Sequence, residues 1–166
     1  DVTNNRDTIT GLSEKTRYFI SLFVRDSSGN WSSPATGAQV QAVTRDITPP
    51  ENVSSLIATG RAGNMVILSW MPSISSDADS IMIRYSNSAY PSDTGSGTFW
   101  KRVSAVKTGD TITGLAPGSI YFAGLFVRDS SHNWSAAASG ARDSAYVPML
   151  PPGPLTYTPS VVVGSV

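Results

Sequence analysis

The chain has 166 residues, of which 40% are hydrophobic and 14% are charged, a composition that suits a packed domain of ordinary size with further chain beside it. Twelve basic and twelve acidic residues cancel, which argues against nucleic-acid binding and against attraction to anionic membranes. The absence of cysteine excludes a thiolate zinc site, a thiol nucleophile and a disulfide. No apolar run approaches the roughly 20 residues that cross a bilayer, so we expect no membrane insertion.

The first element in the chain is one half of an internal repeat. Residues 7–32 match residues 110–135 at 18 of 26 positions, at a constant offset of 103 residues. This offset is the size of one β-sandwich domain, and only the second copy has about 60 residues of its own in front of it. We therefore predict that residues 1–46 are the last strands of a partial domain and that residues 47–146 form a complete one. No charged-then-apolar leader begins at Asp1, so an export signal is expected to lie upstream or to have been removed.

Short β-rich runs alternate with turn clusters along the complete copy, and none has a sustained period of 3.6 residues. Seven strands at intervals of about 8–15 residues are typical of a two-sheet sandwich. The predicted fold class is therefore all-β, an immunoglobulin-like, seven-stranded β-sandwich. The predicted strands are 53–59, 65–71, 80–86, 98–106, 110–113, 121–127 and 134–143.

Alternation assigns the two faces of the predicted strands. The inward set is Val66, Leu68, Trp70, Ile81, Ile83, Tyr85, Tyr121, Ala123, Leu125 and Val127. An apolar stripe then remains on the outer side, where a sheet face is normally polar. This candidate interaction face comprises Phe19, Phe23, Met82, Phe122 and Phe126, with Trp100 as a further candidate. Either a partner covers it, or a loop or tail of the same chain does.

The end of the chain is predicted to be a spacer followed by a further β-prone segment. Residues 147–155 form a proline-rich linker with a semi-rigid, extended backbone. Residues 156–166 carry no charge and include three consecutive valines. This tail is either the start of another domain or a strand that pairs with the partial domain of a neighbouring copy.

Trp70, Tyr85 and the corner of Leu115, Pro117 and Tyr121 resemble residues of the fibronectin type III family. The Asp-Ser-Ser-x-Asn-Trp-Ser turn and the Pro-Pro entry resemble those of its bacterial extracellular members. Trp70 and Tyr85 lie at the family's core positions, and Leu115-x-Pro117-x-x-x-Tyr121 resembles its tyrosine corner. The first copy keeps the leucine and tyrosine of this corner but has Glu14 in place of the proline. The resemblance covers residues 48–146 in full and 1–46 in part, and it implies an extracellular or cell-surface location.

The candidate catalytic and metal-binding residues all lie in one turn. His132 is the only histidine, but Gly29 replaces it in the first copy, which favours a turn position over a general base. Asp129 and Asn133, like Asp26 and Asn30, offer oxygen atoms to calcium. Asp and Asn also bond their own backbone in turns, and that interpretation is preferred. We therefore expect no enzymatic activity, no cofactor and no metal ion.

Trp31 and Trp134 follow this turn in the two copies and are the candidate glycan contacts. An exposed tryptophan stacks on a sugar ring, but sugar-binding platforms need several aligned aromatic side chains. Packing across the mouth of the sandwich is therefore the preferred interpretation. Carbohydrate binding stays an alternative.

These observations predict a non-catalytic structural, spacer or protein-interaction module of a bacterial extracellular protein, built from tandem sandwiches. Fold alone does not decide function, so two alternatives stay open. One is an accessory carbohydrate-binding module of a secreted polysaccharide-degrading enzyme. The other is a subunit of an extracellular filament, in which neighbouring copies complete the partial domain.

Overall fold

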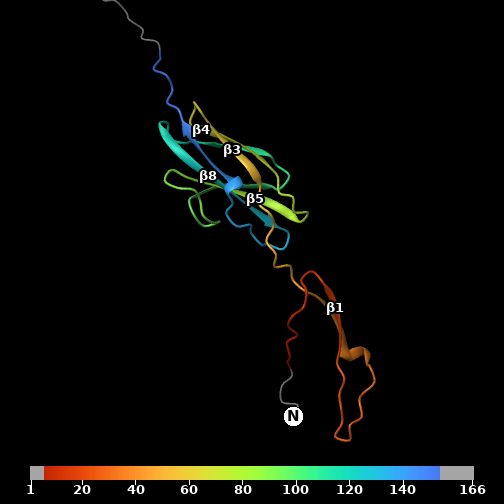
Figure 1. The fold of residues 1–166 in the computed structure, drawn as a ribbon. Coiled ribbons are helices and arrows are strands. Elements are labelled where there is room, and N and C mark those ends of the chain that lie inside the picture. The colour runs from red at the N-terminus through yellow and green to blue at the C-terminus, as the bar shows by residue number, and fades with distance from the viewer. Residues whose placement is uncertain (1–5, 154–166) are drawn as a thin grey trace, which may run out of the picture.

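The computed structural model describes residues 6–153, whose strands form three antiparallel sheets (Figure 1). A two-stranded hairpin, β1–β2, lies at one end of an elongated molecule, and a β-sandwich lies at the other. The sandwich pairs a three-stranded sheet, in the order β3-β4-β7, with a four-stranded sheet, in the order β6-β5-β8-β9. The strands are β1 (Arg17–Ser21), β2 (Gln39–Val43), β3 (Ser54–Arg61), β4 (Met65–Met71), β5 (Ala78–Ser86), β6 (Thr98–Ser104), β7 (Gly109–Thr113), β8 (Ser119–Asp129) and β9 (Arg142–Val147).

The core lies between the two sheets, where the period-two pattern of the sequence predicts it. In β4 the buried and more exposed positions alternate, and in β5 Ile81 and Ile83 are fully buried. Tyr85 of β5 and Tyr121 of the adjacent strand β8 pack edge to face, with ring centroids 5.9 Å apart. Residues 6–153 contain no helix long and apolar enough to cross a membrane.

The tyrosine corner forms in both copies. The backbone N–H of Ala116 donates to the Tyr121 hydroxyl oxygen at 2.9 Å, and Ser13 N–H donates to Tyr18 at 2.9 Å. The bond ties the crossover before the long strand to the strand itself. It forms in the first copy although Glu14 stands where the second copy has Pro117, so the corner does not require the proline.

The last predicted strand, 134–143, is wrong. Trp134 makes only an isolated bridge to Arg128, and Ser139–Ala141 is a short 3₁₀ helix. The strand that pairs with β8 begins at Arg142 and ends at Val147, which is fully buried. Three consecutive alanines at 136–138 explain the shift, because alanine has low β propensity. The core of the complete copy thus extends one residue beyond the predicted boundary at 146.

The first copy has two strands where three were predicted. In the complete copy β7 pairs only with β4, and no counterpart of β4 precedes the hairpin within the described residues. Residues 7–10, the counterpart of β7, are accordingly irregular. Leu22 and Val24 are 69% and 71% exposed, whereas their counterparts Leu125 and Val127 are buried. The predicted strand exchange through residues 156–166 lies outside the described residues.

Candidate functional site

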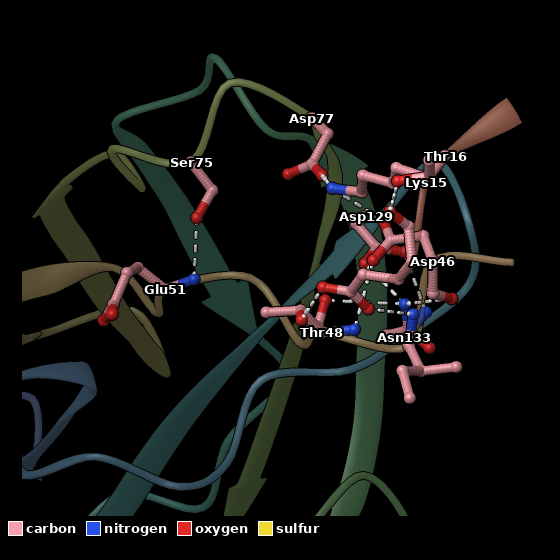
Figure 2. A network of polar contacts seen from close by, with 11 residues as sticks. Lys15, Thr16, Asp46, Thr48, Glu51, Ser75, Asp77, Asp129 and Asn133 are labelled. Carbon is pink, nitrogen blue, oxygen red and sulfur yellow. Dashed lines mark hydrogen bonds and ion pairs between the residues drawn. The ribbon is translucent and has the colours of Figure 1, made fainter. Parts of the chain in front are cut away.

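The richest group of polar contacts lies where the first copy meets the complete one (Figure 2). Three parts of the chain converge there: the tyrosine corner of the first copy, the linker between β2 and β3, and the loops at the adjacent end of the sandwich. We call this region the junction. Its geometry decides how the hairpin and the sandwich are held together.

The corner contacts the linker through two consecutive side chains. The Glu14 carboxylate accepts hydrogen bonds from the Ile47 N–H at 2.8 Å and from the Thr48 hydroxyl. The Lys15 Nζ lies 2.9 Å from Asp46 Oδ2 and 2.7 Å from Asp77 Oδ2. Since Asp46 belongs to the linker and Asp77 to the sandwich, the Lys15 ammonium joins all three parts.

The backbone at Lys15 indicates that its side chain is used. Lys15 has φ 52°, a left-handed conformation that residues with a Cβ rarely adopt. The second copy has Gly118 at this position, with φ 78°, and glycine is the residue that this conformation favours. The first copy retains a lysine at a glycine position, and that lysine makes two ion pairs.

The sandwich contacts the linker from the other side through the turn after β8. The Asn133 side-chain amide donates to the Asp46 carbonyl at 3.2 Å and lies 3.5 Å from the Thr48 carbonyl. The Asp129 carboxylate orients this amide by accepting its N–H at 2.9 Å and the Asn133 backbone N–H at 2.8 Å. Asp129 is nearly fully buried, so its position is fixed by packing as well as by hydrogen bonds.

The electrostatics of the junction are those of a charged clamp. The Lys15 ammonium lowers the pKa of Asp46, with the Thr48 N–H and the Ser131 hydroxyl as further donors. Asp77 and Asp46 together raise the pKa of Lys15. The Thr48 hydroxyl and the Ile47 N–H lower the pKa of Glu14. Each ionised form is therefore favoured near neutral pH.

Three carboxylates gather at the junction. One oxygen from each of Asp46, Asp77 and Asp129 lies within 4.8 Å of the others. Two of these groups pair with Lys15 and the third with Asn133, so the protein itself supplies their positive charge and donors. The Asp26 carboxylate is likewise engaged by Asn30 and by the Ser28 N–H. In each copy the aspartate and the asparagine thus hydrogen-bond within their own turn.

His132 is exposed, at φ 78°, and its counterpart Gly29 has φ 93°. The position is thus a left-handed turn residue in both copies.

The loop of residues 87–97, between β5 and β6, covers the outer face of β5 and β8. This face comprises Met82, Phe122 and Phe126. Phe126 and Met82 are buried, and Tyr90 packs against Phe122 with ring centroids 5.0 Å apart. The Arg84 guanidinium holds the loop by donating to four consecutive carbonyls, those of residues 94–97. On the hairpin no such loop is present among the described residues, and Phe19 and Phe23 are exposed. Trp100 packs against the core instead of lying on the outer face.

The two candidate glycan contacts differ in their surroundings. Trp134 lies between two guanidinium groups, with Arg102 5.1 Å and Arg128 5.9 Å from its ring. Trp31 has only Arg25, at 5.7 Å, and is 66% exposed. Arg102 comes from β6, a strand with no counterpart in the hairpin. Trp134 is thus partly buried and contacts two arginines of the sandwich, whereas Trp31 is exposed on the hairpin.

Sequence analysis missed the residues that carry the junction, namely Glu14, Lys15, Asp46 and Asp77. One signal was available. The corner of the first copy departs from that of the second at Glu14 and Lys15, where the second copy has Pro117 and Gly118. A departure from a repeat at adjacent positions indicates a local role that the repeat itself does not share.

No family model and no curated protein matches the chain. Solved structures do. The fn3 domain of human contactin 1 matches with a TM-score of 0.54 and 15% identity, over 75% of this chain and 98% of that one. Chicken CNTN1 FN1-FN3 matches at 0.53 and 14%, over 82% and 45%, and the fn3 domain of human collagen alpha-1(XX) at 0.50 and 15%, over 68% and 97%. Together with the two-sheet topology and the tyrosine corner, these matches show that the sandwich has the fibronectin type III fold.

Proposed function

We propose that the chain is a non-catalytic spacer of an extracellular, bacterial surface protein, in which consecutive fibronectin type III units are held end to end in a fixed orientation. The observation that carries this proposal is the Lys15 ammonium, which bridges the linker carboxylate of Asp46 and the sandwich carboxylate of Asp77. A flexible tether needs no such bridge. Interfaces between domains of one chain otherwise permit relative motion.

The contacts on both sides of the linker support a fixed orientation. Glu14 and Lys15 hold it from the corner of the first copy, and Asn133 holds it from the sandwich. Pro49 and Pro50 follow directly and restrict the backbone further, because each proline fixes its own φ angle. The linker is thus restrained along its length by side chains from both units and by its own composition.

Distance measurements between two spin labels test this proposal. The chain has no cysteine, so Gln41→Cys on β2 and Thr98→Cys on β6 give two unique labels at exposed positions. We expect a narrow distance distribution in the parent protein and a broad one in Lys15→Met, which keeps the aliphatic stem but removes the ammonium. Lys107→Met is the matched control, because Lys107 pairs with an aspartate within the sandwich. Equal widths in the parent and Lys15→Met would refute the spacer proposal.

The hairpin face favours a second function, as an assembly subunit. Leu22 and Val24 are exposed, although Leu125 and Val127 at the same positions are core residues of the sandwich. Leu22 also lines an open apolar hollow, together with Ile9, Leu12 and Ile20 among others. Unpaired strand edges and apolar faces pair with other chains, and we propose a second copy as the partner. Sedimentation of the chain with and without residues 155–166 tests this: a monomer at high concentration contradicts assembly, and assembly of the truncated chain contradicts strand exchange through the tail.

A further inference from the structure

The two copies carry the same turn in the same conformation. Asn30 and Asn133 each donate a backbone N–H at 2.8 Å and a side-chain N–H, at 3.0 and 2.9 Å, to the aspartate four residues earlier. The aspartate N–H in turn donates to the asparagine carbonyl at 3.0 Å in the first copy and 3.1 Å in the second. The turn therefore folds equally well on the isolated hairpin and in the complete sandwich.

In the complete copy this turn has an occupant, which is the linker that precedes the sandwich. The Asn133 amide donates to the Asp46 carbonyl. The Asp46 carboxylate lies beside the turn, with one oxygen within 4.8 Å of an Asp129 carboxylate oxygen. Lys15 and, to a smaller extent, the Ser131 hydroxyl lower the pKa of Asp46. The amide and the hydroxyl of the turn are both present in the first copy, as Asn30 and Ser28. There, among the described residues, the Asn30 side-chain amide donates to Asp26 alone, and the turn is largely exposed.

The sequences of the two turns differ at a single position. Residues 26–32 and 129–135 are identical except for Gly29 in place of His132. The His132 side chain is exposed and makes none of the contacts to the linker described above. The difference therefore leaves the linker-binding groups unchanged.

We propose that the Asp26–Asn30 turn is a binding site for the linker of a preceding fibronectin type III unit, an extended peptide of the Arg45–Pro49 kind. The Asn30 amide donates to a backbone carbonyl of this peptide, and the Ser28 hydroxyl donates to its aspartate. This proposal rests on the spacer function and extends it. Each such turn binds the linker that precedes its own unit, so the junction described above is one of a series.

The chemistry of the occupant follows from the linker that is already bound. It presents carbonyls and one carboxylate to the turn. The segment after β9 does not fit this description, because Met149 lies where the linker after β2 has Asp46. The turn is therefore expected to discriminate between these two linkers of the same chain.

A peptide titration tests the site directly. The probe is a synthetic peptide with the sequence of residues 43–50, added to the ¹⁵N-labelled 166-residue chain. We expect saturable shifts of the Gly29 N–H and of the Asn30 backbone and side-chain amides at about millimolar peptide. We expect none at Asn133, whose site the chain's own linker fills. A peptide of residues 146–153 should cause no shift, and Asn30→Ala should weaken binding by about fivefold or more. No shift at Asn30, or equal shifts with both peptides, would overturn the proposal.

A second test uses the covalent junction. His132→Gly makes the turn of the complete copy identical to that of the first, so the spin-label distance distribution should stay as narrow as in the parent. A broad distribution would show that the first copy's turn cannot hold a linker, and it would overturn the inference. The spacer proposal fails in a different way, through an unchanged distribution in Lys15→Met, so the two failures are distinguishable.

Discussion

Asn133→Ala should destabilise the complete domain, since this side chain joins the linker to the buried carboxylate of Asp129. The substitution removes a hydrogen bond to an ionised acceptor, about 1.5–3 kcal/mol, and one to the Asp46 carbonyl, about 1 kcal/mol. The contact at 3.5 Å to Thr48 is too long to add to this sum. Because Asn133 is partly exposed, water compensates in part, and we expect a loss of about 2–3 kcal/mol.

Equilibrium unfolding in guanidinium chloride, followed by tryptophan fluorescence, measures this loss as a shift of the midpoint at unchanged slope. Asn30→Ala is the matched control, because the same turn on the hairpin makes no contact with the sandwich; it should leave the sandwich transition unmoved. Asn133→Asp keeps the shape but places a carboxylate beside Asp129, and it should cost at least as much as alanine. A loss below about 0.5 kcal/mol in Asn133→Ala, or a milder effect in Asn133→Asp, would refute the reasoning.

Three further outcomes are expected. Trp70→Ala should cost about 3–5 kcal/mol in the same melts, because it leaves a large cavity between the sheets; a loss under about 1 kcal/mol would contradict the strand facing. The Asp46 carboxylate has a lowered pKa, so its contribution to the stability of the junction is present above the ordinary pKa of 3.8 and is lost as the pH falls below it. Lys15 has a raised pKa, so its contribution to the same stability is complete below the ordinary pKa of 10.5 and is lost only at still higher pH. The spin-label distribution should therefore stay constant between about pH 5 and 10 and broaden in acid; broadening at neutral pH would contradict the clamp. Arg84→Ala should release the loop over residues 87–97 and raise the binding of an apolar dye to the outer face, and unchanged dye binding would show that Arg84 does not hold the loop.

Much of the fold could be predicted from sequence because its signals are local. The alternation in β4 and β5 identifies their buried faces directly, and the repeated Leu-x-x-x-x-x-Tyr corner fixes the start of the long strand. The last strand escaped prediction because the alternation after Trp134 is interrupted by a crossover ending at Ala141, whose small side chain is buried. Periodicity does not distinguish a crossover that buries a side chain in the core from a strand that lines the core.

The junction could not be predicted for a different reason. Lys15 lies 31 residues from Asp46 and 62 from Asp77 in the sequence, and nothing in the chain between them indicates that they meet. Cover of the outer face by a loop of the same chain could be predicted only as one of two alternatives. The apolar pattern of this face was visible, but the loop that covers it depends on one arginine and four backbone carbonyls, which leave no hydrophobic signal.

The two copies also differ in the chemistry of the end that meets the next segment of the chain. In the first copy the corner before β1 carries Glu14 and Lys15 and the linker after β2 carries Asp46, so this junction is charged. In the complete copy Gly118, just before β8, lies at the lysine position, and a Cβ atom there would lie 2.6 Å from the Cε of Met149, which follows β9. Met149 thus occupies the space that corresponds to the start of the Lys15 side chain in the first copy. This second end is therefore apolar. The end of the sandwich that presents Asn133 and Asp77, from two different loops, matches the charged end and leaves these polar groups unpaired against the apolar one. Unpaired buried polar groups are costly, so mispaired units are disfavoured by the same contacts that stabilise the correct pair.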